Sequence, residues 1–224
     1  MAKKNKYSDM TMDYSEILPS MFEDGVELDT EVSLRVQANM TVTQMRRIQS
    51  EIALEKELPW HWEQGFSYHC ISTGDVDGLS YFRAAVKQQK IRYALLATWS
   101  MAAEDIRELR HWVKKGYIGR IDVYVGEIFL SAGRSLERRE LIRLCQESGG
   151  RLVIFRTHAK IIAGFGERFD FAIAGSANIN TNPRTEQMTI TINSDLAKFY
   201  KDYFDEIKSF ERNFDEVEPW QPKS

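Results

Sequence analysis

The sequence predicts an α/β protein whose mixed or largely parallel β-sheet is covered by helices on both faces. From Phe66 onward, short β-branched and aromatic segments alternate with longer amphipathic segments, which is the order of strands and helices in such folds. The chain has 224 residues, of which 43% are hydrophobic. A chain of this length and composition can bury one substantial core, so a single main domain is expected.

The N-terminal part lacks this alternation. Residues 1–40 show little periodicity, and we expect an extended or partly disordered arm that docks on a neighbouring molecule or partner protein. Thr41 and Gln44 match a capping box, which predicts a helix over residues 41–59 that packs on the domain or on a partner. Its apolar positions recur on one helical face: Met45, Ile48 and Ile52.

The main domain is predicted to span residues 60–213, followed by an acidic tail at 214–224 to which no chemistry is assigned. Strands are expected at 66–72, 91–99, 120–126, 151–157, 171–174 and 186–193, and helices at 79–89, 101–115, 135–148 and 195–210. Ser100 and Ser194 are the predicted N-caps, while Gly116 and Gly149 are predicted to end helices.

Two further features have competing interpretations. The segment Trp60-His61-Trp62 could stack on nucleobases or pack in a core or interface, and packing is favoured. Residues 83–160 hold 16 Lys and Arg against 8 Asp and Glu, although the net charge of the chain is −3. This basic region is either a set of solvated helix faces or a surface that attracts phosphate.

The composition also indicates the cellular compartment in which the protein is expected. The only two cysteines, Cys70 and Cys145, each lie in an apolar setting, which predicts buried free thiols and neither a disulfide nor a metal site. No apolar run approaches the ~18 residues of a membrane span, and no signal-peptide core follows the basic start. We therefore expect a cytoplasmic protein that does not associate with membranes.

The most informative stretch runs from residue 155 to residue 187. His158 and Lys160 lie two positions apart on or beside strands, so their side chains are expected to face the same side. The turn Gly175-Ser176-Ala177-Asn178 supplies a hydroxyl and an amide, and Glu186 follows. A nucleophile or base, a fixed cation and two neutral hydrogen-bonding groups suit a substrate with negatively charged oxygens, above all a phosphodiester. Metal binding fits less well, because lysine is a poor ligand at neutral pH.

His158-Ala159-Lys160 followed by Gly175-Ser176-Ala177-Asn178 resembles the signature of the phospholipase D superfamily, the HKD motif. The resemblance covers about residues 66–210 and implies a phospholipase D-like mixed β-sheet flanked by helices on both faces. Glu186 stands where the family often has a glutamate. One position departs, because the family usually has an Asp five residues after the lysine and this chain has Phe165.

The resemblance also implies a mechanism. His158 would attack phosphorus to form a phosphohistidine, while Lys160 and Asn178 bind the non-bridging oxygens. Ser176 would orient Asn178 or the phosphate, and Glu186 would set the tautomer of a histidine. No metal or organic cofactor is implied.

The chain holds one such motif, since the other histidines lack a lysine two residues later: His61, His69 and His111. It is therefore similar to the single-motif bacterial endonucleases of the superfamily, in which two motifs meet across a two-fold axis. A homodimer is implied, in which the second histidine protonates the leaving oxygen and later activates water.

The function predicted is that of a metal-independent nuclease, with a small nucleotide diester also open. Nucleic acid is preferred over lipid because no signal, anchor or basic amphipathic helix is visible and the region around the motif is basic. The alternative is a phospholipase D-like scaffold or nucleic-acid-binding module without turnover, motivated by Phe165 and by the acidic ends of the chain.

Overall fold

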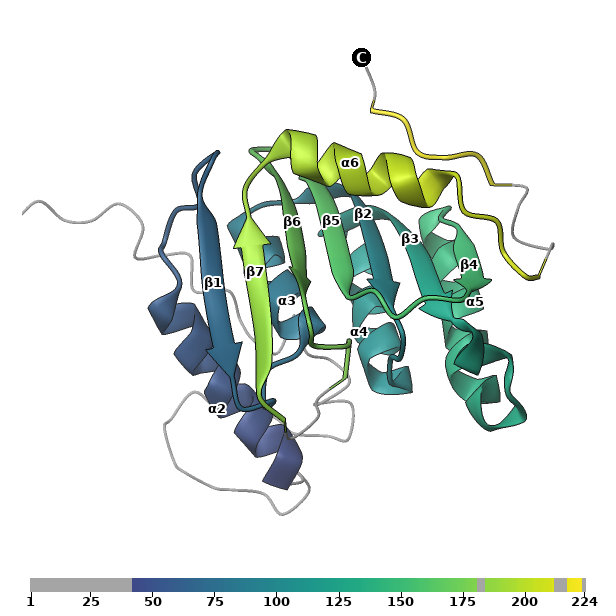
Figure 1. The fold of residues 1–224 in the computed structure, drawn as a ribbon, viewed down its shortest axis with the longest axis horizontal. Coiled ribbons are helices and arrows are strands. Elements are labelled where there is room, and N and C mark those ends of the chain that lie inside the picture. Colours follow the sequence, from purple (N-terminus) through teal and green to yellow (C-terminus); the bar gives the residue numbers. More distant parts are fainter. Residues whose placement is uncertain (1–41, 181–183, 212–216, 223–224) are drawn as a thin grey trace, which may run out of the picture.

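The computed structural model of the chain describes residues 42–180, 184–211 and 217–222, and side chains from residue 47 onward. Its centre is a seven-stranded sheet with the order β1-β7-β6-β5-β2-β3-β4 (Figure 1). The strands are β1 Ser67–Ser72, β2 Ile91–Thr98, β3 Ile118–Gly126, β4 Leu152–Phe155, β5 Ile161–Gly166, β6 Asp170–Gly175 and β7 Glu186–Thr191. Since β2, β3 and β4 pair in parallel and the other pairs are antiparallel, the sheet is mixed, as predicted.

Helices cover both faces of this sheet. They are α2 Val42–Glu57, α3 Gly78–Gln88, α4 Ala103–Lys114, α5 Ser135–Ser148 and α6 Ser194–Asp205, with short 3₁₀ turns η2 Glu127–Leu130 and η3 Ala132–Arg134. Successive residues of β2 point to opposite faces. Ala94 and Leu96 join the core cluster beneath α3, α4 and α5, whereas Leu95 joins a second cluster beneath α6 (Figure 1). The predicted two-sided α/β architecture is therefore confirmed.

One edge of the sheet collects the carboxyl ends of five strands. The pairing directions mean that β1, β6, β2, β3 and β4 all run the same way, while β7 and β5 run against them. The predicted motif lies at this edge, which is the lower edge in Figure 1, because β4 ends and β5 begins around it. In α/β sheets this is the edge at which ligands usually bind.

Two predicted N-cap residues do not cap their helices, because local hydrogen bonds start these helices at other positions. Ser100 is not an N-cap, because its carbonyl accepts the hydroxyl of Thr98 at 2.9 Å and α4 begins only at Ala103. Ser194 is not a cap either, since the side chain of Asn193 accepts the amide of Leu196 at 2.8 Å.

The predicted helix at 195–210 and the predicted strand at 151–157 are both too long. The helix ends at Asp205, and the chain then turns back to the edge strand β4, where the amide of Phe210 donates to the carbonyl of Ile154 at 2.8 Å. The strand ends at Phe155, before the motif. The helix ends at Gly116 and Gly149 are confirmed, and both glycines have positive φ.

The described C-terminal residues 217–222 contact the sheet. The ring of Trp220 stacks on that of Tyr93 with centroids 4.6 Å apart and also contacts Phe165 at 5.4 Å. The sequence indicated no role for this tryptophan. The predicted arm at 1–40 and the cap residue Thr41 lie outside the described residues.

Trp62 and Trp60 have different environments. Trp62 is 4% exposed and contacts the rings of Tyr68 and Phe169, which confirms the packing interpretation, whereas Trp60 is 86% exposed. Both cysteines are free thiols, with Cys145 buried and Cys70 half-buried. Among the described residues, no helix is long and apolar enough to cross a membrane.

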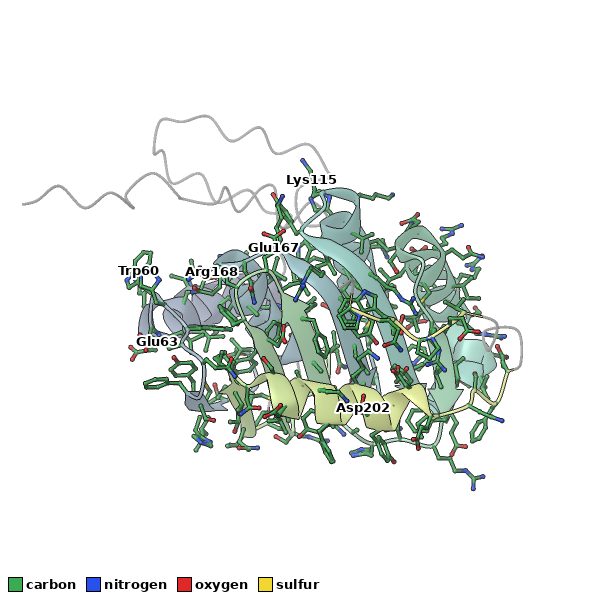
Figure 2. The ribbon with its side chains drawn as sticks, turned by 90° about the horizontal axis from the view of Figure 1, so that it is seen from above. Trp60, Glu63, Lys115, Glu167, Arg168 and Asp202 are labelled. Atoms are coloured by element: carbon green, nitrogen blue, oxygen red, sulfur yellow. The ribbon has the colours of Figure 1, made fainter. Side chains whose placement is uncertain are left out.

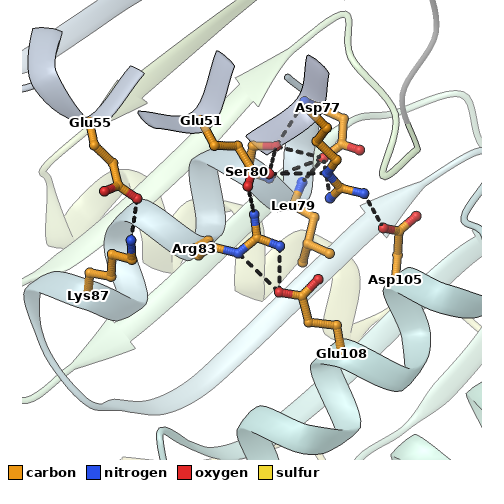
Figure 3. A network of polar contacts seen from close by, with 10 residues as sticks. Glu51, Glu55, Asp77, Leu79, Ser80, Arg83, Lys87, Asp105 and Glu108 are labelled. Atoms are coloured by element: carbon orange, nitrogen blue, oxygen red, sulfur yellow. Dashed lines mark hydrogen bonds and ion pairs between the residues drawn. The ribbon is translucent and has the colours of Figure 1, made fainter. Parts of the chain in front are cut away.

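A buried polar network attaches α2 to α3 and α4 (Figure 3). Arg47 of α2 lies 2.8 Å from a carboxylate oxygen of Asp105, while the Nε of Arg83 lies 3.0 Å from Glu108. Four buried carboxylates face these two guanidinium groups: Glu51, Asp77, Asp105 and Glu108. Burial favours the neutral acid, and Asp77 and Glu108 add like charge, so the pKa of Asp105 rises to about 7 despite the attraction of Arg47.

This pKa predicts a pH-dependent stability. The pKa of Asp in an unfolded chain is about 3.9, whereas the pKa of folded Asp105 is about 7. The folded state therefore holds an extra proton between these values. Asp105 should contribute up to about 1.4 kcal/mol per pH unit as the pH falls from 7 towards 4, and this contribution is lost above pH 7.

The measurement is the free energy of unfolding of wild type and Asp105→Asn by urea denaturation from pH 5 to pH 8. We expect wild type to lose stability relative to the variant as the pH rises. Glu104→Gln is the matched control, since this carboxylate lies on the same helix with 66% of its side chain exposed. Parallel curves for wild type and Asp105→Asn would contradict the assignment.

Candidate functional site

His158 and Lys160 meet at the carboxyl edge of the sheet. His158 lies in the loop between β4 and β5 and is exposed, whereas Lys160 immediately precedes β5 and is only 8% exposed. The Nζ of Lys160 lies 2.7 Å from the Nδ1 of His158 and 2.6 Å from its carbonyl oxygen. The two side chains are thus in contact, as the sequence predicted, although the histidine is held by a loop.

Opposing effects act on the ammonium of Lys160. Burial lowers its pKa from the usual range, and the negative charge of Glu186 acts in the opposite direction. An ammonium that donates to Nδ1 leaves the proton of a neutral imidazole on Nε2. Nζ also lies 3.4 Å from Nε2, so this cation is within hydrogen-bond reach of both ring nitrogens of His158.

The predicted small-residue turn follows β6 directly. A Cβ on Gly175 would lie 2.1 Å from the carbonyl oxygen of Gln187, so only glycine allows β7 to approach this closely. The next residue, Ser176, accepts the amide of Gln187 at 3.0 Å and donates its hydroxyl to Glu186. The strand pairing therefore brings Ser176 and Glu186 together at the edge that holds Lys160.

Glu186 does not hold the histidine of its own chain. Among the described residues, no hydrogen bond joins its carboxylate to His158, and its hydrogen-bond partner is Ser176. The tautomer-setting role that the resemblance gives to Glu186 is thus absent within one chain, and its role towards a histidine of another copy stays a prediction.

Asn178 is anchored through its main chain. Its carbonyl accepts the amide of Gly78 at 2.9 Å, and Gly78 opens α3. A Cβ on Gly78 would already touch this loop at 3.3 to 3.4 Å. The half-buried amide side chain lies 3.4 Å from the hydroxyl of Thr98 at the end of β2. Asn178 is therefore placed by α3 and β2, beside the strand ends that flank the motif.

One residue of this site has no signal in the sequence that points to it. Trp99 follows β2, and its ring lies beside the imidazole of His158, with centroids 5.7 Å apart. The sequence predicts it only as the last residue of the strand at 91–99. Because β2 pairs with β5 only in the folded sheet, no spacing in the sequence signals this contact.

The position of Phe165 explains the departure from the motif. This residue lies five positions after Lys160 and near the far end of β5, where it packs on Tyr93. Five residues of extended chain span about 17 Å. A carboxylate at position 165 would therefore lie far from the reacting groups, and the aromatic ring instead fills the core beneath α6.

The basic middle of the chain is largely paired internally. At least twelve of the sixteen Lys and Arg residues between 83 and 160 lie within 4.0 Å of a carboxylate. This finding favours the interpretation of solvated and structural charges for most of them. Exposed pairs contribute at most about 1 kcal/mol, so phosphate can still displace a carboxylate at the surface.

The described part of the chain contains no group of three or more His, Cys, Asp or Glu residues placed to hold a metal ion. The chemistry that the arrangement offers comes from an exposed imidazole, a buried ammonium, a hydroxyl and an amide. These are the groups that nucleophilic attack on a phosphodiester requires.

Comparisons with known proteins give structural matches only. No protein-family model and no curated protein sequence matches the chain. The structure is similar to polyphosphate kinase from Porphyromonas gingivalis, with a TM-score of 0.47 and 19% identity over 62% of this chain and 25% of that one. It is also similar to phosphatidylserine synthase from Haemophilus influenzae Rd KW20, with a TM-score of 0.47 and 13% identity over 68% of this chain and 41% of that one.

A third similar structure is Nuc, a phospholipase D family member from Salmonella typhimurium. Its TM-score is 0.41 and its identity 15%, over 62% of this chain and 92% of that one. The aligned part of this chain thus spans a quarter of the kinase chain and less than half of the synthase chain, but nearly all of Nuc.

Proposed function

We propose that the chain is a phosphodiesterase that cleaves nucleic acid through a phosphohistidine formed on His158. The observation that carries this is the contact of 2.7 Å between the buried Nζ of Lys160 and the Nδ1 of exposed His158. A buried cation beside an exposed imidazole provides a nucleophile and a site for phosphate oxygens in one place.

The reaction has two steps. The Nε2 of His158 attacks phosphorus and forms a P–N bond, while the bond to the leaving oxygen breaks and that oxygen takes a proton from an acid. Water then attacks phosphorus, and the P–N bond breaks, which returns the imidazole of His158 and releases the phosphate product. The group that gave its proton to the leaving oxygen in the first step takes the proton of this water. Each step needs two groups of complementary protonation, and one copy of the motif supplies only one of them.

The Lys160 contact suggests how two identical histidines take different roles. In the copy that binds the substrate phosphate, a phosphate oxygen draws Nζ away from Nδ1, so the ring proton can move to Nδ1 and leave Nε2 free to attack. In the second copy the ring is the imidazolium and Nζ donates to the carbonyl oxygen of His158 at 2.6 Å. Its Nε2 gives a proton to the leaving oxygen, which leaves a neutral imidazole that can later act as a base. Asn178 and Ser176 complete the binding of the phosphate oxygens. The proposal therefore includes a homodimer.

Nucleic acid is the proposed substrate because exposed arginines flank the motif. Arg156 lies two residues before His158 with 82% of its side chain exposed, although it pairs with Glu127 at 3.2 Å. Arg184 is exposed on the other side of the motif, after the turn at 175–178. Nucleic acid carries a phosphate at each nucleotide, so the phosphates next to the cleaved one can bind such arginines.

The test is cleavage of bis-p-nitrophenyl phosphate and of plasmid DNA in EDTA by wild type and by Lys160→Ala. Because Lys160 is a preorganised donor, its loss should raise the barrier by about 2–4 kcal/mol, which lowers kcat about 30- to 1,000-fold. Lys115→Ala is the matched control. This exposed lysine, labelled in Figure 2, follows α4 and precedes the start of β3, whereas Lys160 lies at the carboxyl edge of the sheet. A variant whose KM alone changes would argue against this role.

The second candidate is a nucleic-acid-binding module without turnover. It is favoured by one observation, namely that Glu186 binds Ser176 and that His158 has no carboxylate partner within the described part of the chain. Binding of DNA or RNA by wild type, with no cleavage of either substrate, would support this candidate over the enzyme.

A further inference from the structure

Trp99 is an exposed aromatic residue built into the edge that holds the motif. It follows β2, it is 37% exposed, and its ring is tilted by 42° against the imidazole of His158 at 5.7 Å. An exposed indole leaves a large apolar surface in water, so exposed tryptophans are often found where a ligand or a partner binds.

The neighbouring residues fix this position. A Cβ at Gly126, the last residue of β3, would lie 2.8 Å from the Cδ1 of Trp99 and 3.1 Å from its carbonyl oxygen. Thr98 binds the carbonyl of Ser100 at 2.9 Å and thereby holds the chain on the other side of the tryptophan. The indole is thus held between β3 and the histidine with part of its surface open, which is the arrangement of a preformed stacking platform.

We propose that Trp99 stacks on an unpaired nucleobase next to the scissile phosphate, so that the substrate is single-stranded nucleic acid. This inference rests on the proposed function of His158. The ring of Trp99 lies 5.7 Å from the imidazole that attacks phosphorus, measured between centroids, so the base of a nucleotide next to the scissile phosphate is within its reach. A paired base cannot reach the indole, because it must first leave its stack.

Stacking on an indole tolerates every base, since each has a π face. The site should therefore prefer single strands over duplex with little sequence preference. A purely structural role, in which Trp99 only supports the ring of His158, makes a different prediction. Loss of the indole would then lower kcat/KM equally for substrates with and without a base. If the substrate is instead a lipid, the indole would insert between the headgroups and the acyl chains of a membrane, and the protein would bind vesicles.

The experiment compares two diesters with the same leaving group. Thymidine 5′-(p-nitrophenyl phosphate) carries a base, whereas methyl p-nitrophenyl phosphate carries none. Trp99→Ala should lower kcat/KM for the thymidine diester about 5- to 100-fold, as expected for the loss of one stacked base, and should leave the methyl diester within about twofold. Trp99→Phe should restore most of the loss, because a phenyl ring still stacks.

Trp60→Ala is the matched control. Trp60, labelled in Figure 2, is 86% exposed and lies in the segment before the start of β1. It should change neither diester. Equal losses on both diesters in Trp99→Ala, or no loss on either, would overturn the stacking role while leaving the phosphodiesterase intact. Absence of cleavage of both diesters by wild type refutes the proposed function instead.

A binding measurement decides the inference even without turnover. Fluorescein-labelled oligo(dT) and the same strand annealed to oligo(dA) are titrated with wild type, Trp99→Ala and Trp60→Ala. Wild type should prefer the single strand, and only Trp99→Ala should lose this preference, by about 5- to 100-fold in Kd. Unchanged oligo(dT) binding by Trp99→Ala would overturn the proposal. So would Trp99-dependent binding of phosphatidylglycerol vesicles without any binding of oligo(dT).

Discussion

Replacing His158 by alanine is expected to reduce phosphodiesterase turnover by a factor on the order of 10⁴ or more, because the same residue serves as nucleophile in one copy and as acid in the other. The free energy of unfolding should stay within about 0.5 kcal/mol of wild type, since the side chain is exposed. Activity is measured on bis-p-nitrophenyl phosphate in EDTA, and stability by urea denaturation.

The chain offers a matched control for this substitution. His69 on β1 is also exposed, and its ring binds a surface hydroxyl, that of Thr189, at 3.1 Å. His69→Ala should keep full activity. Chemical trapping adds a direct measurement, because denatured wild type quenched during turnover should carry an acid-labile phosphoryl adduct that His158→Ala lacks. Equal turnover in wild type and His158→Ala would remove the basis of the proposed function.

The parts of the site that are close in sequence were predictable. His158 and Lys160 are two residues apart, so their contact depends on little beyond an extended chain, and the structure shows it at 2.7 Å. Ser176 and Glu186 are joined by one chain reversal, which the flanking strands indicated. These contacts follow from local geometry, which explains why spacing alone was informative.

The parts that depend on strand order were not predictable. Trp99 reaches His158 because β2 pairs with β5, and nothing in either segment specifies that pairing. Phe165 stood out as a missing carboxylate, yet its place in the core under α6 became visible only with the sheet. The helix predicted at 195–210 ends at Asp205 for the same reason. The residues that follow Asp205 bind the edge strand β4, which is distant in sequence.

The packing of α2 was predictable only in part from its own sequence. Its apolar positions predicted a helix that packs through a hydrophobic face, but Ile52 is 38% exposed. Leu54 does pack against the core, and Arg47 and Glu51 add ion pairs with carboxylates and an arginine of α3 and α4. Charged residues are rarely buried without partners, and a single segment does not reveal where those partners are.

Hybrid dimers that pair wild type with His158→Ala are expected to lose nearly all activity. If two motifs form one site on a two-fold axis, each hybrid lacks either the nucleophile or the acid, so its turnover should fall by about 10²- to 10⁴-fold. The two subunits are co-expressed with different affinity tags, and hybrids are purified on both. Wild type should sediment at about twice the chain mass of 26.0 kDa.

The size of the loss distinguishes a shared site from two separate ones. If each chain held a complete site, a hybrid would keep about half of the wild-type activity, as expected for independent sites in a symmetric dimer. Hybrids of wild type with His69→Ala control for the effect of tags and mixing and should be fully active. In the structure of the dimer, His158 of both copies should face one common cleft, with the Nζ of Lys160 beside each ring. Half-active hybrids or a fully active monomer would contradict the two-chain site and leave only a mechanism in which one histidine serves both steps.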